Sequence, residues 1–373
     1  MPIVDTITEW LLLKSRASIL ELGSSRLRWA EGVFVNNRPV FSNFRQLPAP
    51  PSVLSSQLGQ FVCDTAEMAK TLKQLSEQKF IFENYASIVI PDQAFHFGSF
   101  WVPAVAAKTG LQPFVEREIQ KTSSLPYKEY SVKYEFGEKK DNKIPVHYCA
   151  LPLGILNEIL EICDEAKIVP IAVQPSFAGL VKLLKTSLGE SKHPSVFLHI
   201  GNESITAGIY GNDGLRAVHI INRGISDLIK IIQTTGKSAE EAQKALTDEL
   251  VLLEDPTSDA QFEIETYRLI EAALADILQK IYGFLLLFSN DHPDESGFIK
   301  IVLSGGGTSI RNLDKLITSN IGIPTVALSR ELDMIAADFK SPAHENLETL
   351  APIIGNMLLE PWRFDRYDRI MAA

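Results

Sequence analysis

Two short stretches of the sequence combine an apolar run, a glycine and small polar residues in a pattern that can bind phosphate. Residues 19–27 read ILELGSSRL and residues 197–205 read FLHIGNESI. Glycine lets the backbone approach a ligand closely, and successive N–H groups in a turn form a concave site for anions. Any hairpin can show the same pattern, so either stretch alone is weak evidence. Because it recurs in both halves of the chain, we predict a duplicated phosphate-binding hairpin, with Gly23, Ser24 and Ser25 in one copy and Gly201, Asn202 and Ser204 in the other.

A glycine-rich junction in the second half could contact another part of the same ligand. Residues 304–310 read SGGGTSI after an apolar run. We expect a buried strand at 299–303 to lead the glycines directly into the N-terminus of a helix at 310–319. Helix N-termini favour anionic groups, so Gly305, Gly306 and Gly307 are candidate contacts for an adenine, ribose or phosphate group.

A fourth candidate is a helix expected at residues 238–247. Ser238 is its expected N-cap, and the spacing places Glu241 and Lys244 on one helix face. Taken alone, this pair is better explained as a solvated surface pair. Its position relative to the other three motifs raises the alternative that it contacts ligand.

Hydrophobic periodicity predicts the elements that position these motifs. A capping box at residues 6–9 opens a short helix within 1–16, and a Pro-rich link follows at 47–51. The segment between Pro91 and Pro175 reads as one compact α+β insert. We expect strands at 18–22, 27–35, 87–90, 95–102, 130–136, 146–151, 169–173, 195–200, 204–210, 215–221, 299–303 and 325–328, and helices at 66–75, 113–122, 153–165, 225–234, 238–247, 260–287 and 310–319.

Composition excludes several classes of protein. The net charge is -10 and no Lys/Arg run is present, which argues against nucleic-acid binding. The three cysteines (Cys63, Cys149 and Cys163) have no CxxC spacing, so we expect neither a disulfide framework nor a zinc site, and a reducing cytoplasm fits best. No stretch approaches the roughly 20 apolar residues of a membrane helix, and no signal peptide is recognisable. We therefore expect a cytoplasmic protein that does not span a membrane.

With these four motifs in this order, the chain resembles the family of the type IV pilus assembly protein PilM, a relative of the cell-division protein FtsA. The resemblance covers nearly the whole length. Its most specific part is the insert, where the family runs from a strand through Leu-Pro and a Glu-rich helix to paired strands, a further helix and a strand. The matching stretches here are SIVIPD at 87–92, VP at 102–103, FVEREI at 114–119, LPY at 125–127 and PIAVQPSF at 170–177.

The resemblance implies an α/β, actin-like (ASKHA) fold of two lobes with an FtsA/PilM-type inserted α+β subdomain. It places the first lobe at residues 17–90 and 174–194, together with the C-terminal 341–373. The insert then comprises 91–173 and the second lobe 195–340, after an N-terminal helix at 1–16. ATP is expected in the cleft between the lobes.

The family's role is scaffolding at the cytoplasmic face of the inner membrane. The resemblance implies that this chain holds the N-terminal tail of a PilN-like membrane protein and links the pilus motor complex to it, so that it is peripheral to the membrane through a protein partner. The tail is expected in a groove of the first lobe beside the insert, near residues 91–122. A homo-oligomer is left open.

Carried over by position, the two hairpins match the family's phosphate hairpins and the glycine triplet its adenosine loop, while Glu241 and Lys244 match the ribose and adenine helix. The acidic positions differ, because the family usually has Asp where this chain has Glu21 and His199. Mg²⁺ prefers oxygen ligands in octahedral geometry. Glu21 could still reach such an ion through water, whereas His199 offers no anionic oxygen. We therefore expect nucleotide binding, if present, to be structural and hydrolysis to be very slow or absent.

Two other functions fit the same fold. A sugar or acetate kinase would need a carboxylate base in its cleft, and Asp92, Asp213 and Asp227 are candidates without special surroundings. An FtsA-like cell-division protein or a type II secretion scaffold would carry an amphipathic or transmembrane segment. Neither segment is recognisable here.

Overall fold

The computed structural model describes residues 16–358 apart from 36–37, 56–59, 77–84, 106–109, 111, 123–125, 138, 140–141, 188–192, 212–213, 254–263, 294–296 and 332–345. The expected N-terminal helix at 1–16 lies outside these residues except for Arg16, which begins the first strand. The chain divides into two compact units. The first comprises Met1–Thr186, Ala337–Asn346 and Leu350–Ala373, and the second Ser187–Ala336 and Leu347–Thr349.

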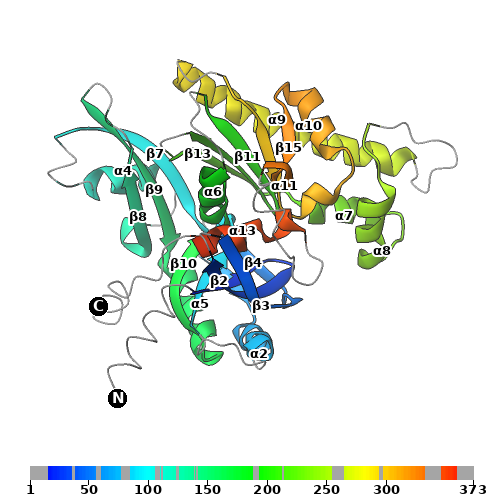
Figure 1. The fold of residues 1–373 in the computed structure, drawn as a ribbon, viewed down its shortest axis with the longest axis horizontal. Coiled ribbons are helices and arrows are strands. Elements are labelled where there is room, and N and C mark those ends of the chain that lie inside the picture. Colours follow the sequence, from blue (N-terminus) through cyan, green and yellow to red (C-terminus); the bar gives the residue numbers. More distant parts are fainter. Residues whose placement is uncertain are drawn as a thin grey trace. The chain divides into compact units, whose positions relative to one another are not determined.

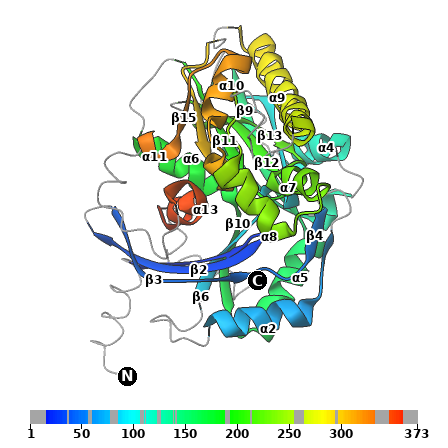
Figure 2. The ribbon, with the colours of Figure 1, turned by 90° about the vertical axis from the view of Figure 1, so that its right-hand side faces the viewer.

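The first unit is built on a five-stranded sheet with the order β10-β6-β1-β2-β3. The first three strands in sequence are antiparallel neighbours, β6 pairs with β1 in parallel, and β10 pairs with β6 in parallel. Figure 2 shows α2 on one side of the β2–β3 part of this sheet and α13 on the other. The sheet strands are β1 (Arg16–Leu22), β2 (Arg26–Val35), β3 (Arg38–Pro48), β6 (Tyr85–Ile90) and β10 (Val169–Pro175), and the helices are α2 (Thr65–Ser76), α5 (Leu153–Glu165), α6 (Ser176–Ser187) and α13 (Leu347–Leu358).

The second unit repeats this topology. Its sheet has the order β13-β12-β11-β14-β15, with an antiparallel β11-β12-β13 meander; β14 pairs with β11 in parallel and β15 pairs with β14 in parallel. Each strand of the first sheet therefore has a counterpart, and β1–β2 corresponds to β11–β12. The strands are β11 (Ser195–Ile200), β12 (Ile205–Gly211), β13 (Gly214–Ile221), β14 (Ile301–Ser304) and β15 (Thr325–Ala327).

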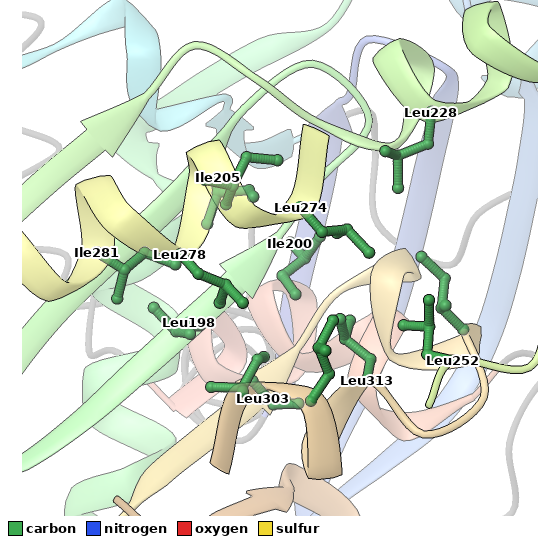
Figure 3. Packing of buried hydrophobic residues seen from close by; sticks show 14 of the residues in the cluster. Leu198, Ile200, Ile205, Leu228, Leu252, Leu274, Leu278, Ile281, Leu303 and Leu313 are labelled. Atoms are coloured by element: carbon green, nitrogen blue, oxygen red, sulfur yellow. The ribbon is translucent and has the colours of Figure 1, made fainter. Parts of the chain in front are cut away.

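Helices pack on this second sheet around an apolar core. Figure 3 shows Leu198, Ile200 and Ile205 of the strands facing Leu274 and Leu278 of α9. A cavity of about 20 Å³ lies within this core, lined by apolar side chains. It offers no polar partners to hold a water molecule. The helices are α7 (Ile225–Gln233), α8 (Ala239–Lys244), α9 (Ile264–Asp291), α10 (Leu313–Ile321) and the short α11 (Leu328–Glu331), with a π-helical turn at Ala245–Glu249.

Among the described residues, α9 alone is long and apolar enough to cross a membrane by length and composition, with a mean hydropathy of 1.4 over its best window. The sequence analysis above predicts no such segment. Its inward face, from Tyr267 to Phe288, packs in the core of the second unit, which is the arrangement of a core helix.

The insert forms a three-stranded antiparallel sheet with the order β7-β9-β8 (Figure 1). Helix α4 covers one face, where Val115 and Ile119 pack with Val102 and Val146. The elements are β7 (His96–Pro103), α4 (Gln112–Thr122), β8 (Tyr130–Phe136) and β9 (Lys143–Pro152).

The limit that we expect for the insert, at residue 173, lies within β10. Helix α5 buries Ile155, Ile159 and Ile162 in the core below the first unit's main sheet, and β10 pairs with β6 of that sheet. The separate three-stranded sheet therefore ends at β9. Two short strands that we did not predict follow the Pro-rich link at 47–51: β4 (Ser52–Ser55) and β5 (Gln60–Cys63).

Candidate functional site

The first hairpin turns tightly at Gly23, between β1 and β2. The Gly23 N–H donates to the carbonyl of Arg26 at 3.1 Å. A Cβ on Gly23 would lie 2.7 Å from that same carbonyl oxygen, so the turn requires glycine. The N–H groups of Ser24 and Ser25 donate to no described residue and follow one another in the turn, as an anion nest requires. Arg26, exposed beside this turn, is a cation that the sequence reasoning did not single out.

The second hairpin has the same turn in the second unit. The Gly201 N–H donates to the carbonyl of Ser204 at 2.9 Å. The carbonyls of Gly201 and Asn202 accept the N–H groups of Ile225 and Ser226 at 3.1 and 2.8 Å, so the turn is bound to the start of α7. The two predicted hairpins thus share one hydrogen-bonding pattern.

The glycine triplet lies against the second hairpin. Gly305 has a φ of 88°, in the left-handed region that favours glycine. Side chains at Gly305 or Gly307 would collide with Ile200, the residue before Gly201. The triplet enters the 3₁₀ turn η5 (Gly306–Ser309), and α10 begins only at Leu313, so the expected direct passage into a helix does not occur.

Helix α8 packs through Ala242 and leaves Glu241 and Lys244 exposed. The Glu241 carboxylate accepts the N–H of Ser238 at 2.8 Å, which completes a capping box. These bonds lower the pKa of Glu241. In the part of the chain that the structure describes, no hydrogen bond or ion pair joins Glu241 or Lys244 to the glycine triplet or to the second hairpin.

Glu21, the candidate metal contact of the first hairpin, is engaged by its own sheet. Its Oε2 lies 2.9 Å from Nη1 of Arg28, and the two residues face each other in the β1–β2 register. Both side chains are about one-tenth exposed, at 10% and 11%. The carboxylate is therefore neutralised by a buried neighbour.

His199, at the matching position of the second hairpin, is also engaged. Its Nδ1 lies 3.1 Å from the hydroxyl of Ser304, which is its direct partner on β14. No group of three or more His, Cys, Asp or Glu residues that could hold a metal occurs among the described residues. A paired carboxylate and an imidazole do not supply the free anionic oxygens that Mg²⁺ prefers, so these residues do not fit that ion.

Two of the candidate bases for a kinase serve as structural acceptors. Asp92 is buried and accepts the N–H of Phe177 at 3.0 Å, and Asp227 accepts the N–H of Gly224 at 2.9 Å. Asp213 lies outside the described residues. Both described carboxylates are thus occupied at helix N-termini.

No protein-family model matches the sequence, and no curated protein matches it. The structure of a PilM–PilN type IV pilus biogenesis complex is similar over 93% of this chain and 98% of that chain, with a TM-score of 0.74 and 20% identity. This chain has the actin-like fold. The likeness extends to MreB5 of Spiroplasma citri bound to AMPPNP, at a TM-score of 0.52 and 11% identity over 95% of this chain and 98% of that one. The structure of MreB5 bound to ADP has a TM-score of 0.53 and 12% identity, over 97% of this chain and 100% of that chain.

The actin-like fold explains the repeated sheet. Two copies of one topology each end their first strand in a Gly turn, and the solved actin-like neighbours include nucleotide-bound proteins. The predicted fold class is confirmed. The assignment of individual residues to a nucleotide stays a prediction.

Proposed function

We propose that this protein is an actin-like scaffold of type IV pilus assembly, which acts at the cytoplasmic face of the inner membrane. The observation that supports this most is the similarity to the chain in the PilM–PilN complex, which covers almost the whole of both chains. The motifs of the insert, from SIVIPD at 87–92 to PIAVQPSF at 170–177, favour the same family.

In this role the chain binds the N-terminal tail of a PilN-like membrane protein and reaches the membrane through it, beside the pilus motor complex. We place the tail near residues 91–122. Trp101 on β7 is a large side chain of this region that is 43% exposed, and aromatic residues of this kind commonly anchor a peptide.

Nucleotide, in this proposal, is a structural ligand of the two hairpins and the glycine triplet. Glu21 is paired with Arg28 and His199 with Ser304, so neither offers a free carboxylate to a metal or to an attacking water. Binding of ATP without appreciable turnover is what this arrangement supports.

Calorimetry with synthetic PilN-type tail peptides tests the partner. Wild-type protein is expected to bind one such peptide, and Trp101→Ala to weaken it by at least about tenfold, as loss of an aromatic anchor does. Leu160→Ala is the matched control, because Leu160 is 41% exposed on α5, outside residues 91–122. If no tail peptide binds, the pilus assignment fails. If Trp101→Ala and Leu160→Ala weaken binding equally, the tail does not bind near residues 91–122.

Calorimetry with ATP and a phosphate-release assay test the nucleotide role. We expect no turnover above background, with or without Mg²⁺. Rapid phosphate release that disappears in Glu21→Gln would show a working metal site and contradict the proposal.

A further inference from the structure

Four polar side chains lie next to the Gly23 turn on one face of the first unit's sheet. Glu21 of β1 lies directly opposite Arg28 of β2, and Arg28 lies directly opposite Gln46 of β3. Directly opposed residues of neighbouring strands project to the same face. Arg26, two residues before Arg28 on β2, shares that face because side chains alternate along a strand. We call these four residues the polar row.

The polar row contains two guanidinium groups and one carboxylate, so its positive charge exceeds its negative charge. The Glu21 carboxylate is bound to Arg28. Arg26 is exposed, and its Nη1 donates to Oε1 of Gln46, a neutral acceptor, at 3.2 Å. A positive excess repels a divalent cation and attracts an anion. The charge of the polar row therefore agrees with the misfit between Glu21 and Mg²⁺ and favours a phosphate in its place.

Arg26 is also the residue that closes the Gly23 turn. Its carbonyl accepts the Gly23 N–H at 3.1 Å, which fixes its backbone beside the N–H groups of Ser24 and Ser25. Successive N–H groups in such a turn bind anions, and a guanidinium group forms strong, often paired hydrogen bonds with phosphate oxygens. One short segment thus offers backbone donors and a cationic side chain to the same ligand.

The second hairpin has neutral residues where the first has these arginines. Ser204 closes its turn in the place of Arg26, and Thr206 lies opposite His199 in the place of Arg28. The duplicated turn is therefore common to both units, whereas the two arginines occur in the first copy. This difference singles out the first hairpin as the place where phosphate charge is neutralised.

We propose that the first hairpin binds the phosphate chain of a nucleotide directly, without a metal ion, and that Arg26 supplies the counter-charge. Mg²⁺ commonly binds between protein carboxylates and substrate phosphates, and here the carboxylate is engaged by Arg28. The ion pair also reduces the repulsion between Glu21 and a phosphate. The inference rests on the structural role proposed above for nucleotide, but it does not depend on the binding of a PilN-like tail.

Calorimetry on the full chain with ATP, in EDTA and in excess Mg²⁺, tests whether a metal is needed. ATP is expected to bind at least as tightly in EDTA as in Mg²⁺. Inorganic tripolyphosphate in EDTA is expected to displace ATP, because the hairpin recognises phosphate groups. A loss of affinity in EDTA by about tenfold or more, or no displacement by tripolyphosphate, would overturn the proposal.

Arg26→Gln tests the counter-charge at an exposed position. It is expected to weaken ATP binding in EDTA about tenfold, which is the loss of one hydrogen bond to a charged group. Arg45→Gln is the matched control, because Arg45 is an exposed arginine of β3 that lies opposite Trp29, on the other face of the same sheet. Its effect should stay below about twofold, since solvent and salt screen a charge on that face. Equal effects of the two variants would overturn the proposal.

Glu21→Gln separates a phosphate site from a metal site by the sign of its effect. A carboxylate that holds Mg²⁺ through water contributes to the binding of ATP with Mg²⁺, so its loss would weaken that binding. In the proposed site the carboxylate repels phosphate, so Glu21→Gln is expected to tighten ATP binding in EDTA by about threefold.

Urea unfolding shows whether Glu21→Gln is folded, and weaker binding in EDTA by the folded variant would contradict the proposal. If that variant does not fold, the comparison of Arg26→Gln with Arg45→Gln still decides. If ATP binds in neither buffer, the metal-free site fails, while the tail peptides still test the pilus assignment.

Discussion

Arg28 holds Glu21 in an ion pair of 2.9 Å between directly opposed residues of β1 and β2. Glu21 lies two residues before the Gly23 turn, at the position for which we predicted a contact to a metal ion through water. The ion pair with Arg28 therefore occupies the Glu21 carboxylate, which we had considered as a metal ligand, within the β1–β2 pair.

Arg28→Met is expected to lower the free energy of unfolding by about 3 kcal/mol, since it leaves a buried carboxylate without its cation. Arg223→Met is the control, because Arg223 pairs with Asp227 while 54% exposed and should cost less than about 1 kcal/mol. Urea denaturation followed by tryptophan fluorescence measures both. The double variant Glu21→Gln, Arg28→Met should be less unstable than the two single effects added together; simple additivity would show that the pair is uncoupled.

Gly208→Ala is expected to destabilise the second unit by about 1–3 kcal/mol through overpacking. A Cβ at Gly208 would enter the ring of Phe197, its direct neighbour on β11, which is 1% exposed. Thermal unfolding measures the loss. Adding Phe197→Leu should restore part of the stability that Gly208→Ala loses, because leucine leaves more room for the new Cβ. If it restores none, Phe197 is not the residue with which that Cβ collides.

Gly283→Ala, in contrast, is expected to stabilise the protein. Gly283 lies within α9, and a Cβ there meets nothing within 4 Å. Alanine favours the helix over glycine by about 1 kcal/mol, so the same thermal assay should show a gain of up to that amount. A loss of stability would mean that this face of α9 is covered in solution.

Cys149 and Cys163 are expected to resist alkylation in the folded protein. Burial raises the pKa of the Cys163 thiol to about 12, and burial together with the nearby charge of Asp92 raises the pKa of Cys149 further. Only the thiolate reacts, so both should stay unmodified by iodoacetamide at about pH 8 and react once urea unfolds the chain. A Cys63→Ser variant restricts the mass-spectrometric readout to these two residues.

The folded protein is expected to lose a little stability on acidification because of His219. Its ring stacks on Phe284 with centroids 5.4 Å apart, and desolvation lowers its pKa. In the unfolded chain the pKa of histidine is near 6.5. Below that pH the unfolded chain binds a proton that the folded chain does not, so the free energy of unfolding decreases as the pH falls. His219→Phe should show a smaller fall between about pH 7.5 and 5. Because the residue is exposed, the difference should be modest, and an equal fall in both proteins would contradict the assignment.

The local sequence pattern was enough to predict most helices and strands. Strand β8 begins and ends where the alternation of apolar and polar residues predicts, and β11 where an apolar run predicts. It was not enough for β3, since Pro39, Asn43 and Pro48 are poor strand residues and its pairing comes from the long register with β2. The place of β10 depends on a distant contact in the same way, because the partner of β10 is β6, about 80 residues earlier in the chain.

By itself, the sequence determined the duplicated Gly hairpins and the glycine triplet, because each depends on residues that are neighbours in the chain, while the actin-like class came from the resemblance to a known family. The tertiary structure decided what those motifs touch. Arg28 reaches Glu21 through strand register, Ser304 reaches His199 across a parallel pair, and Glu348 reaches Gly305 from a helix more than forty residues away. Such contacts depend on how distant segments pack, and packing is a property of the whole fold.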